Sequence, residues 1–120
     1  MALPEHDIDA VVELLVADLR GTLSWTEDQA RTFVEPEADM QATYVDDAGR
    51  LAWHLTESIQ QQLHDEFIDT TWPACPIHHR HPLWLNEDDE GPWLWRCLES
   101  GQAIAALGHL RTGGAAEAYR

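Results

Sequence analysis

The sequence predicts an α+β protein, with a helix at the start of its 120 residues and short strands near the end. Two observations support this. Apolar residues near the N-terminus recur at helical spacing, whereas later apolar runs are short, alternate with polar residues and are bounded by turn formers. The composition, 44% hydrophobic and 24% charged, is typical of a globular protein. We therefore expect an N-terminal helix, a short antiparallel sheet, a second helix and a C-terminal β-hairpin.

The first expected element is a helix over residues 7–20, "DIDAVVELLVADLR". Its apolar residues follow the i, i+3, i+4, i+7 pattern of one helical face. Asp7 can cap its start, and Gly21 stands where a helix would end. The acids Asp9, Glu13 and Asp18 are expected on its solvated side.

The middle of the chain predicts strands followed by a helix. Residues 31–34 favour a strand that ends before Pro36. The segments 40–45 and 51–55 alternate and flank "DDAG", which is typical of a hairpin. A helix is then expected from Thr56 or Ser58, because "ESIQQQLHDEFI" is rich in helix formers.

The chain from residue 72 onward contains four of the six tryptophans, and its segments "PLWL", "PWLWRC" and "AIAALGHL" predict short strands. We expect an α+β part over residues 1–71, a second part over 72–112 that shares its core, and a flexible tail over 113–120.

Cysteine and histidine residues gather in "WPACPIHHRHPLW", residues 72–84. Cys75 and His78 are three apart around a proline, so a tight turn can direct both side chains at one ion, and Cys97 follows at the end of an expected strand. Zinc binds such donors in a tetrahedron. His81 is the favoured fourth ligand, while His109 or a water molecule remain alternatives. The predicted metal ligands are Cys75, His78, His81 and Cys97.

The string "WPACPIHHRHPLW…WLWRC…IAALGHL" resembles the zinc-ribbon group over residues 72–110, and a pattern of small uncharacterised bacterial proteins, WPxCPxHxxHPL…WxC. The resemblance implies a zinc-ribbon-like C-terminal hairpin after an α/β start, and it implies no activity. The chain departs from ordinary zinc ribbons in lacking a fourth cysteine, which leaves the fourth ligand open.

Charge and motifs limit the possible functions. The net charge is −15, so nucleic acid is disfavoured as a direct partner, because its phosphates would be repelled. The sequence has no H-E-x-x-H, P-loop or G-x-S-x-G motif, although the acidic loop at residues 86–90 offers candidate bases for an open zinc.

We expect a cytoplasmic, non-catalytic, acidic interaction module with structural zinc and a basic protein partner. No apolar run is long enough for a membrane span, and the N-terminus lacks the basic start of a signal peptide. The alternatives are a zinc hydrolase with water on the metal, and an acidic inhibitor, immunity-type protein or nucleic-acid mimic.

Overall fold

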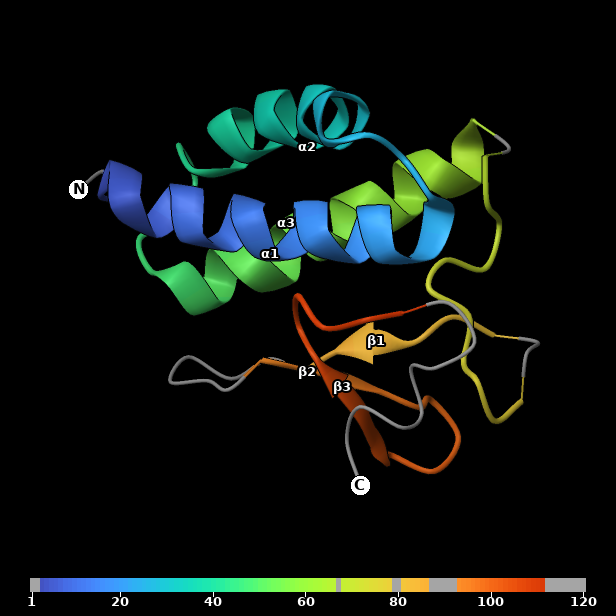
Figure 1. The fold of residues 1–120 in the computed structure, drawn as a ribbon. Coiled ribbons are helices and arrows are strands. Elements are labelled where there is room, and N and C mark those ends of the chain that lie inside the picture. The colour runs from blue at the N-terminus through green and yellow to red at the C-terminus, as the bar shows by residue number, and fades with distance from the viewer. Residues whose placement is uncertain (1–2, 67, 79–80, 87–92, 112–120) are drawn as a thin grey trace.

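The computed structural model describes residues 3–66, 68–78, 81–86 and 93–111, which form a layer of helices over a small sheet (Figure 1). The helices are α1 (Glu5–Leu23), α2 (Glu27–Gln41) and α3 (Ala48–Asp65). The strands β1 (Trp84–Leu85), β2 (Leu94–Arg96) and β3 (Ala103–Ala106) form an antiparallel sheet in the order β1-β2-β3. The α+β class predicted from the sequence is confirmed, as is the antiparallel C-terminal sheet. None of the helices in these ranges is both long and apolar enough to cross a membrane.

Helix α1 confirms the helix expected over residues 7–20 and extends it at both ends. Gly21 is not the stop signal, because the helix continues to Leu23 and Ser24 adopts the left-handed conformation (φ 59°) after it. Gly21 has another role, since a Cβ atom there would lie 2.4 Å from the backbone oxygen of Leu110. The missing side chain lets the C-terminal segment pass close to α1.

The strand expected at residues 31–34 is wrong, because these residues lie inside α2. A capping box starts this helix: the Thr26 hydroxyl accepts from the Gln29 backbone N–H, and the Gln29 side chain accepts from the Thr26 N–H. Pro36 lies within the helix and does not end it.

The hairpin expected over residues 40–55 is also wrong, since "DDAG" leads into α3. The carboxylate of Asp47 accepts a hydrogen bond from the Arg50 N–H and so caps the helix. Leu51 and Leu55 alternate as in a strand, but they begin the buried face of α3 that continues to Ile59 and Leu63. The helix expected from Thr56 or Ser58 is thus the second half of a longer one.

One hydrophobic cluster joins the two layers, with buried residues from all three helices and all three strands. Trp95 of β2 is fully buried and meets Trp72 edge to face, with ring centroids 5.6 Å apart. The Trp72 indole N–H donates to the Thr22 hydroxyl of α1 at 2.7 Å. The sheet is therefore fixed against the helices by packing and by polar contacts.

Asp18 corrects the expectation of a solvated acidic face on α1, because it is completely buried between the layers. Its carboxylate accepts from the Trp95 indole N–H at 2.8 Å and from the backbone N–H groups of Gly108 at 2.8 Å and Leu110 at 2.9 Å. These donors satisfy a charge that would otherwise be costly to bury.

Candidate metal centre

The segment between α3 and β1 forms the loop that carries three of the four candidate ligands. The Cys75 N–H donates to the His81 backbone oxygen at 3.0 Å, and the Leu83 N–H donates to the Pro73 oxygen at 2.7 Å. An isolated antiparallel bridge pairs Ala74 with Pro82. The two limbs of the loop are therefore held side by side, which keeps Cys75 close to His81.

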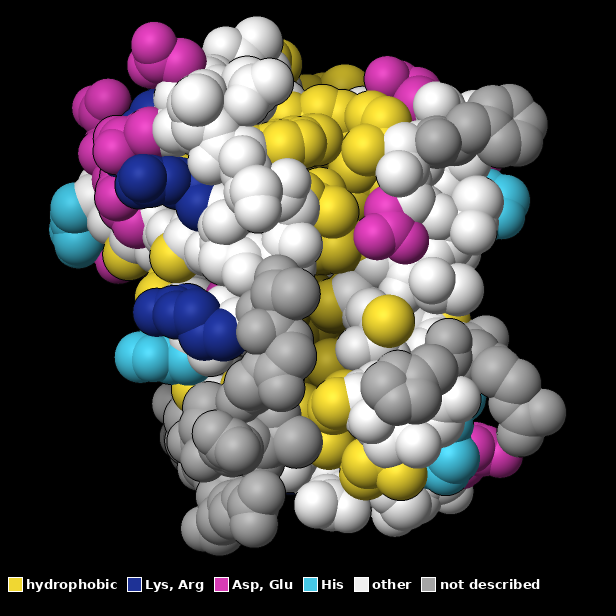
Figure 2. Space-filling model, turned by 45° about the vertical axis from the view of Figure 1, so that its right-hand side comes forward, with side chains coloured by type: hydrophobic (Ala, Val, Ile, Leu, Met, Phe, Trp, Pro, Cys, Tyr) yellow, Lys and Arg dark blue, Asp and Glu magenta, His cyan; other side chains and the backbone are white. Residues whose placement is uncertain are grey.

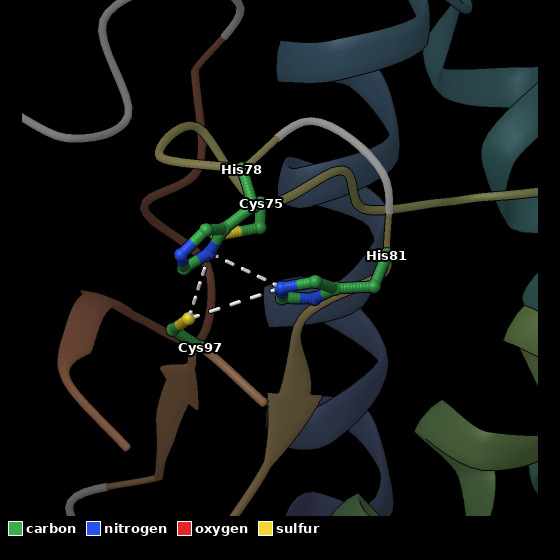
Figure 3. A group of neighbouring side chains, drawn as sticks. All are labelled: Cys75, His78, His81 and Cys97. Carbon is green, nitrogen blue, oxygen red and sulfur yellow. Dashed lines mark hydrogen bonds between the residues drawn. The ribbon is translucent and has the colours of Figure 1, made fainter. Parts of the chain in front are cut away.

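Cys97 is positioned by the turn that joins β2 to β3. Its N–H donates to the Gln102 oxygen at 2.9 Å, and its own backbone oxygen accepts from the Gly101 N–H at 2.9 Å. Gly101 has φ +74°, a left-handed conformation that glycine adopts without strain. The turn directs the Cys97 sulfur toward the loop of residues 75–81 (Figure 3).

The four predicted ligands come together at one point, as Figure 3 shows. One donor atom from each of Cys75, His78, His81 and Cys97 lies within 4.8 Å of all the others. His78 Nδ1 lies 3.6 Å from Cys75 Sγ, 3.3 Å from Cys97 Sγ and 3.2 Å from His81 Nε2. His81 Nε2 lies 4.0 Å from Cys97 Sγ.

These separations match the edges of a zinc tetrahedron. Bonds of about 2.3 Å to sulfur and about 2.0 Å to nitrogen place two nitrogens about 3.3 Å apart, and nitrogen and sulfur about 3.5 Å apart. The nitrogen pair, at 3.2 Å, and the three nitrogen–sulfur pairs, at 3.3, 3.6 and 4.0 Å, lie close to those lengths. The four residues can therefore hold a metal ion with little movement of the chain.

Each histidine also has its outward nitrogen bound by an acceptor. His78 Nε2 lies 2.9 Å from the Glu99 carboxylate, and His81 Nδ1 lies 3.1 Å from the Pro82 backbone oxygen. With the proton on the outer nitrogen, where each acceptor suits it, the neutral ring has a lone pair on the inner nitrogen. Metal-binding histidines are typically oriented by such partners.

Glu99 is the residue at this site that the sequence did not predict. The same carboxylate oxygen lies 3.4 Å from His81 Nε2, the inner nitrogen of that ring, so Glu99 reaches the outer nitrogen of His78 and the inner nitrogen of His81. It follows Cys97 by two residues in the β2–β3 turn, but nothing in its spacing distinguishes it from the other acids of the chain.

Local hydrogen bonds favour the thiolate form of Cys97. Burial opposes ionisation, but hydrogen bonds from the side chain and N–H of Ser100 and from the Glu99 N–H outweigh it and lower the pKa of Cys97 to about 6. The pKa of His81 is raised, first by its hydrogen bond to the Pro82 oxygen and then by the nearby Cys97 and Glu99 charges. A thiolate is the form that binds metal.

The alternatives for the fourth ligand fall in different places. His109 is exposed and is not part of the four-residue group; its charge acts instead on Asp18. Of the acidic loop at residues 86–90 that offers candidate bases for an open zinc, residues 87–90 lie outside the described residues. His81 is therefore the residue that the fold brings to the other three.

Comparison with known proteins gives no relative: no family model, no curated protein and no solved structure matches this chain. The resemblance to zinc ribbons stays a prediction from the sequence.

Proposed function

We propose that the protein is a non-catalytic interaction module whose C-terminal sheet is held by a structural zinc ion. The observation that carries the proposal is the set of four donor atoms at tetrahedral spacing, with both histidines fixed by outer acceptors. Two sulfurs and two imidazole nitrogens are a common donor set for structural zinc.

A structural role is favoured because four protein ligands fill the four corners of the tetrahedron. A catalytic zinc keeps one corner for water or substrate. Both cysteines are fully buried, and they join the loop before β1 to the turn after β2. The strands beside these segments are short, and a sheet of such strands is only weakly stable by itself. A bound metal ion would therefore add stability to this part of the fold.

A role in protein binding is favoured by the surface charge. The net charge is −15, and the arginines of α1 and α2 are already bound to glutamates: Arg20 to Glu27, and Arg31 to Glu13, Glu27 and Glu35. Such a surface attracts a basic partner and repels nucleic acid.

Metal content of protein purified without chelator tests the proposal. We expect one zinc per chain in the wild type and in the His109→Ala control, and weak retention in His81→Ala. His81→Cys, which supplies another zinc donor, should regain the metal and so separates loss of a ligand from loss of the fold. Wild-type protein without zinc would overturn the proposal.

Replacement of zinc by Co²⁺ tests whether the site is closed. We expect an absorption spectrum of tetrahedral cobalt with thiolate ligands that does not change between pH 6.5 and 9, because no metal-bound water is present to ionise at about pH 7. A spectrum that titrates near neutral pH would contradict the closed site and favour the hydrolase alternative.

A further inference from the structure

An apolar groove lies in the helical layer and uses none of the metal ligands. It is an open depression of about 580 Å³, lined by the turn before α2, the first half of α2 and residues at and after the end of α3. Its lining residues are Trp25, Asp28, Gln29, Thr32, Phe33, Glu66 and Ile68. On the face drawn in Figure 2, hydrophobic side chains form a band with acidic side chains beside it.

The floor of the groove is built from two aromatic rings. Trp25 and Phe33 meet edge to face, with centroids 5.3 Å apart and planes at 72°. Both are half-buried and pack against the core, so their rings are already held in place before anything binds. Binding to such a floor costs little side-chain entropy. Ile68 adds an aliphatic wall that is 43% exposed.

The charged groups at the groove are acidic. Asp28 and Glu66 are exposed at its edge, and the remaining polar lining residues, Gln29 and Thr32, are uncharged. The arginine of α2, Arg31, is bound by three glutamates and does not offset these charges. An apolar floor with an acidic edge complements a segment that carries apolar anchors beside cations.

We propose that this groove binds a basic amphipathic segment of a partner protein, with a large apolar side chain against Trp25 and Phe33 and Arg or Lys side chains near Asp28 and Glu66. The inference rests on the proposed interaction function and names the surface that performs it. A second copy of this chain suits the groove poorly, because two chains of charge −15 repel each other.

A synthetic peptide provides the probe, with leucines at helical spacing and arginines on the other side. It is titrated into the zinc-loaded full chain, and binding is followed by the NMR signals of the Trp25 indole N–H and the Ile68 methyl groups. We expect these signals to move most, and the affinity to fall as salt rises. A peptide of the same composition in scrambled order should bind at least about tenfold more weakly.

Matched variants locate the contact. Asp28→Arg with Glu66→Arg should weaken binding by about tenfold or more, whereas Asp9→Arg with Asp39→Arg, which changes the net charge equally, should have little effect. Ile68→Ser should also weaken binding, and Tyr44→Ser, at a side chain 79% exposed on the α2–α3 turn, should not.

Three results would overturn the proposal that the groove binds a basic segment. They are equal binding of the scrambled peptide, equal effects of the two charge-reversal pairs, and NMR shifts confined to residues outside the groove. Self-association that buries Trp25 would also overturn it, in favour of a dimer contact. In each of these cases, a protein that still binds zinc and gives the NMR spectrum of a folded chain would leave the proposed zinc site uncontradicted. Loss of zinc binding would instead contradict the proposed function.

Discussion

At the scale of single residues, the contact of Glu99 with the two histidines has the clearest consequence. Its carboxylate accepts from His78 Nε2–H at 2.9 Å and so fixes the ring with Nδ1 toward the other ligands. We predict that Glu99→Ala weakens zinc binding by about ten- to a hundredfold, as is usual for such outer partners. Competition with a chelating dye measures this affinity.

Two further variants separate orientation of the ring from general charge. Glu99→Gln keeps an oxygen that can accept a hydrogen bond from His78, so it should lose less zinc affinity than Glu99→Ala. Glu5→Ala removes an exposed acid far along the sequence and should leave zinc affinity unchanged. Equal affinity of Glu99→Ala and wild type would show that the histidine needs no such partner.

The same site shows what the sequence could provide. Short-range spacing and the donors that zinc prefers predict Cys75, His78 and His81, and Cys97 is predicted from its place at the end of an expected strand. Glu99 could not be selected, since it is one of 22 acidic residues and its role depends on where a turn places it. Asp18 could have been recognised, because it lies three residues after Leu15 and seven after Val11 on the buried face of α1.

At the scale of elements, the errors of sequence reasoning concern short apolar runs that fit two periodicities. Leu51 and Leu55 fit an alternating strand, but with Ile59 and Leu63 they also fit one helical face, and the longer pattern was the correct one. The strand prediction relied on Pro36 as a stop and did not consider the capping box at Thr26–Gln29, which marks the start of α2. The antiparallel strands after residue 80 were predictable because turn formers separate them.

The junction between α1 and the sheet gives the second prediction. Burial raises the pKa of Asp18 from 3.8 to about 6, against the hydrogen bonds from Gly108, Trp95 and Leu110 and the charge of His109. At pH values between these two pKa values, the Asp18 carboxyl is therefore protonated in the folded protein and ionised in the unfolded chain. This carboxyl adds stability that is complete below about pH 4 and is lost as pH rises through 6, about 3 kcal/mol in all.

Denaturant unfolding of wild type and Asp18→Asn across this range measures the effect. The difference in unfolding free energy between the two proteins isolates Asp18, since metal ligands and other acids titrate alike in both. We expect wild type to lose stability relative to the variant from pH 4 to 7, and the ¹³C signal of the Asp18 carboxyl to titrate near pH 6. A midpoint near 4 with a constant difference would contradict this prediction.

At the scale of the whole molecule, the helices and the sheet beside the candidate metal centre share one hydrophobic cluster. Trp95 donates to Asp18 of α1, the Leu110 oxygen lies against Gly21, and Trp72 donates to Thr22. These contacts come from both sides of the boundary expected near residue 71. We therefore predict that residues 1–71 and 72–112 unfold as one cooperative unit, with or without metal.

Unfolding by denaturant in excess zinc and in chelator tests this cooperativity. A ligand that binds only the folded state stabilises it by about 4 kcal/mol at a thousand times its dissociation constant. We expect chelation to lower the denaturant midpoint, and to lower it equally for two probes. The probes are the far-ultraviolet circular dichroism of the helices and the NMR signal of the buried Trp95 indole. Suppose instead that the Trp95 signal moves on chelation while the helical signal keeps its midpoint. The helices would then be an independent domain, and the metal would stabilise the sheet alone.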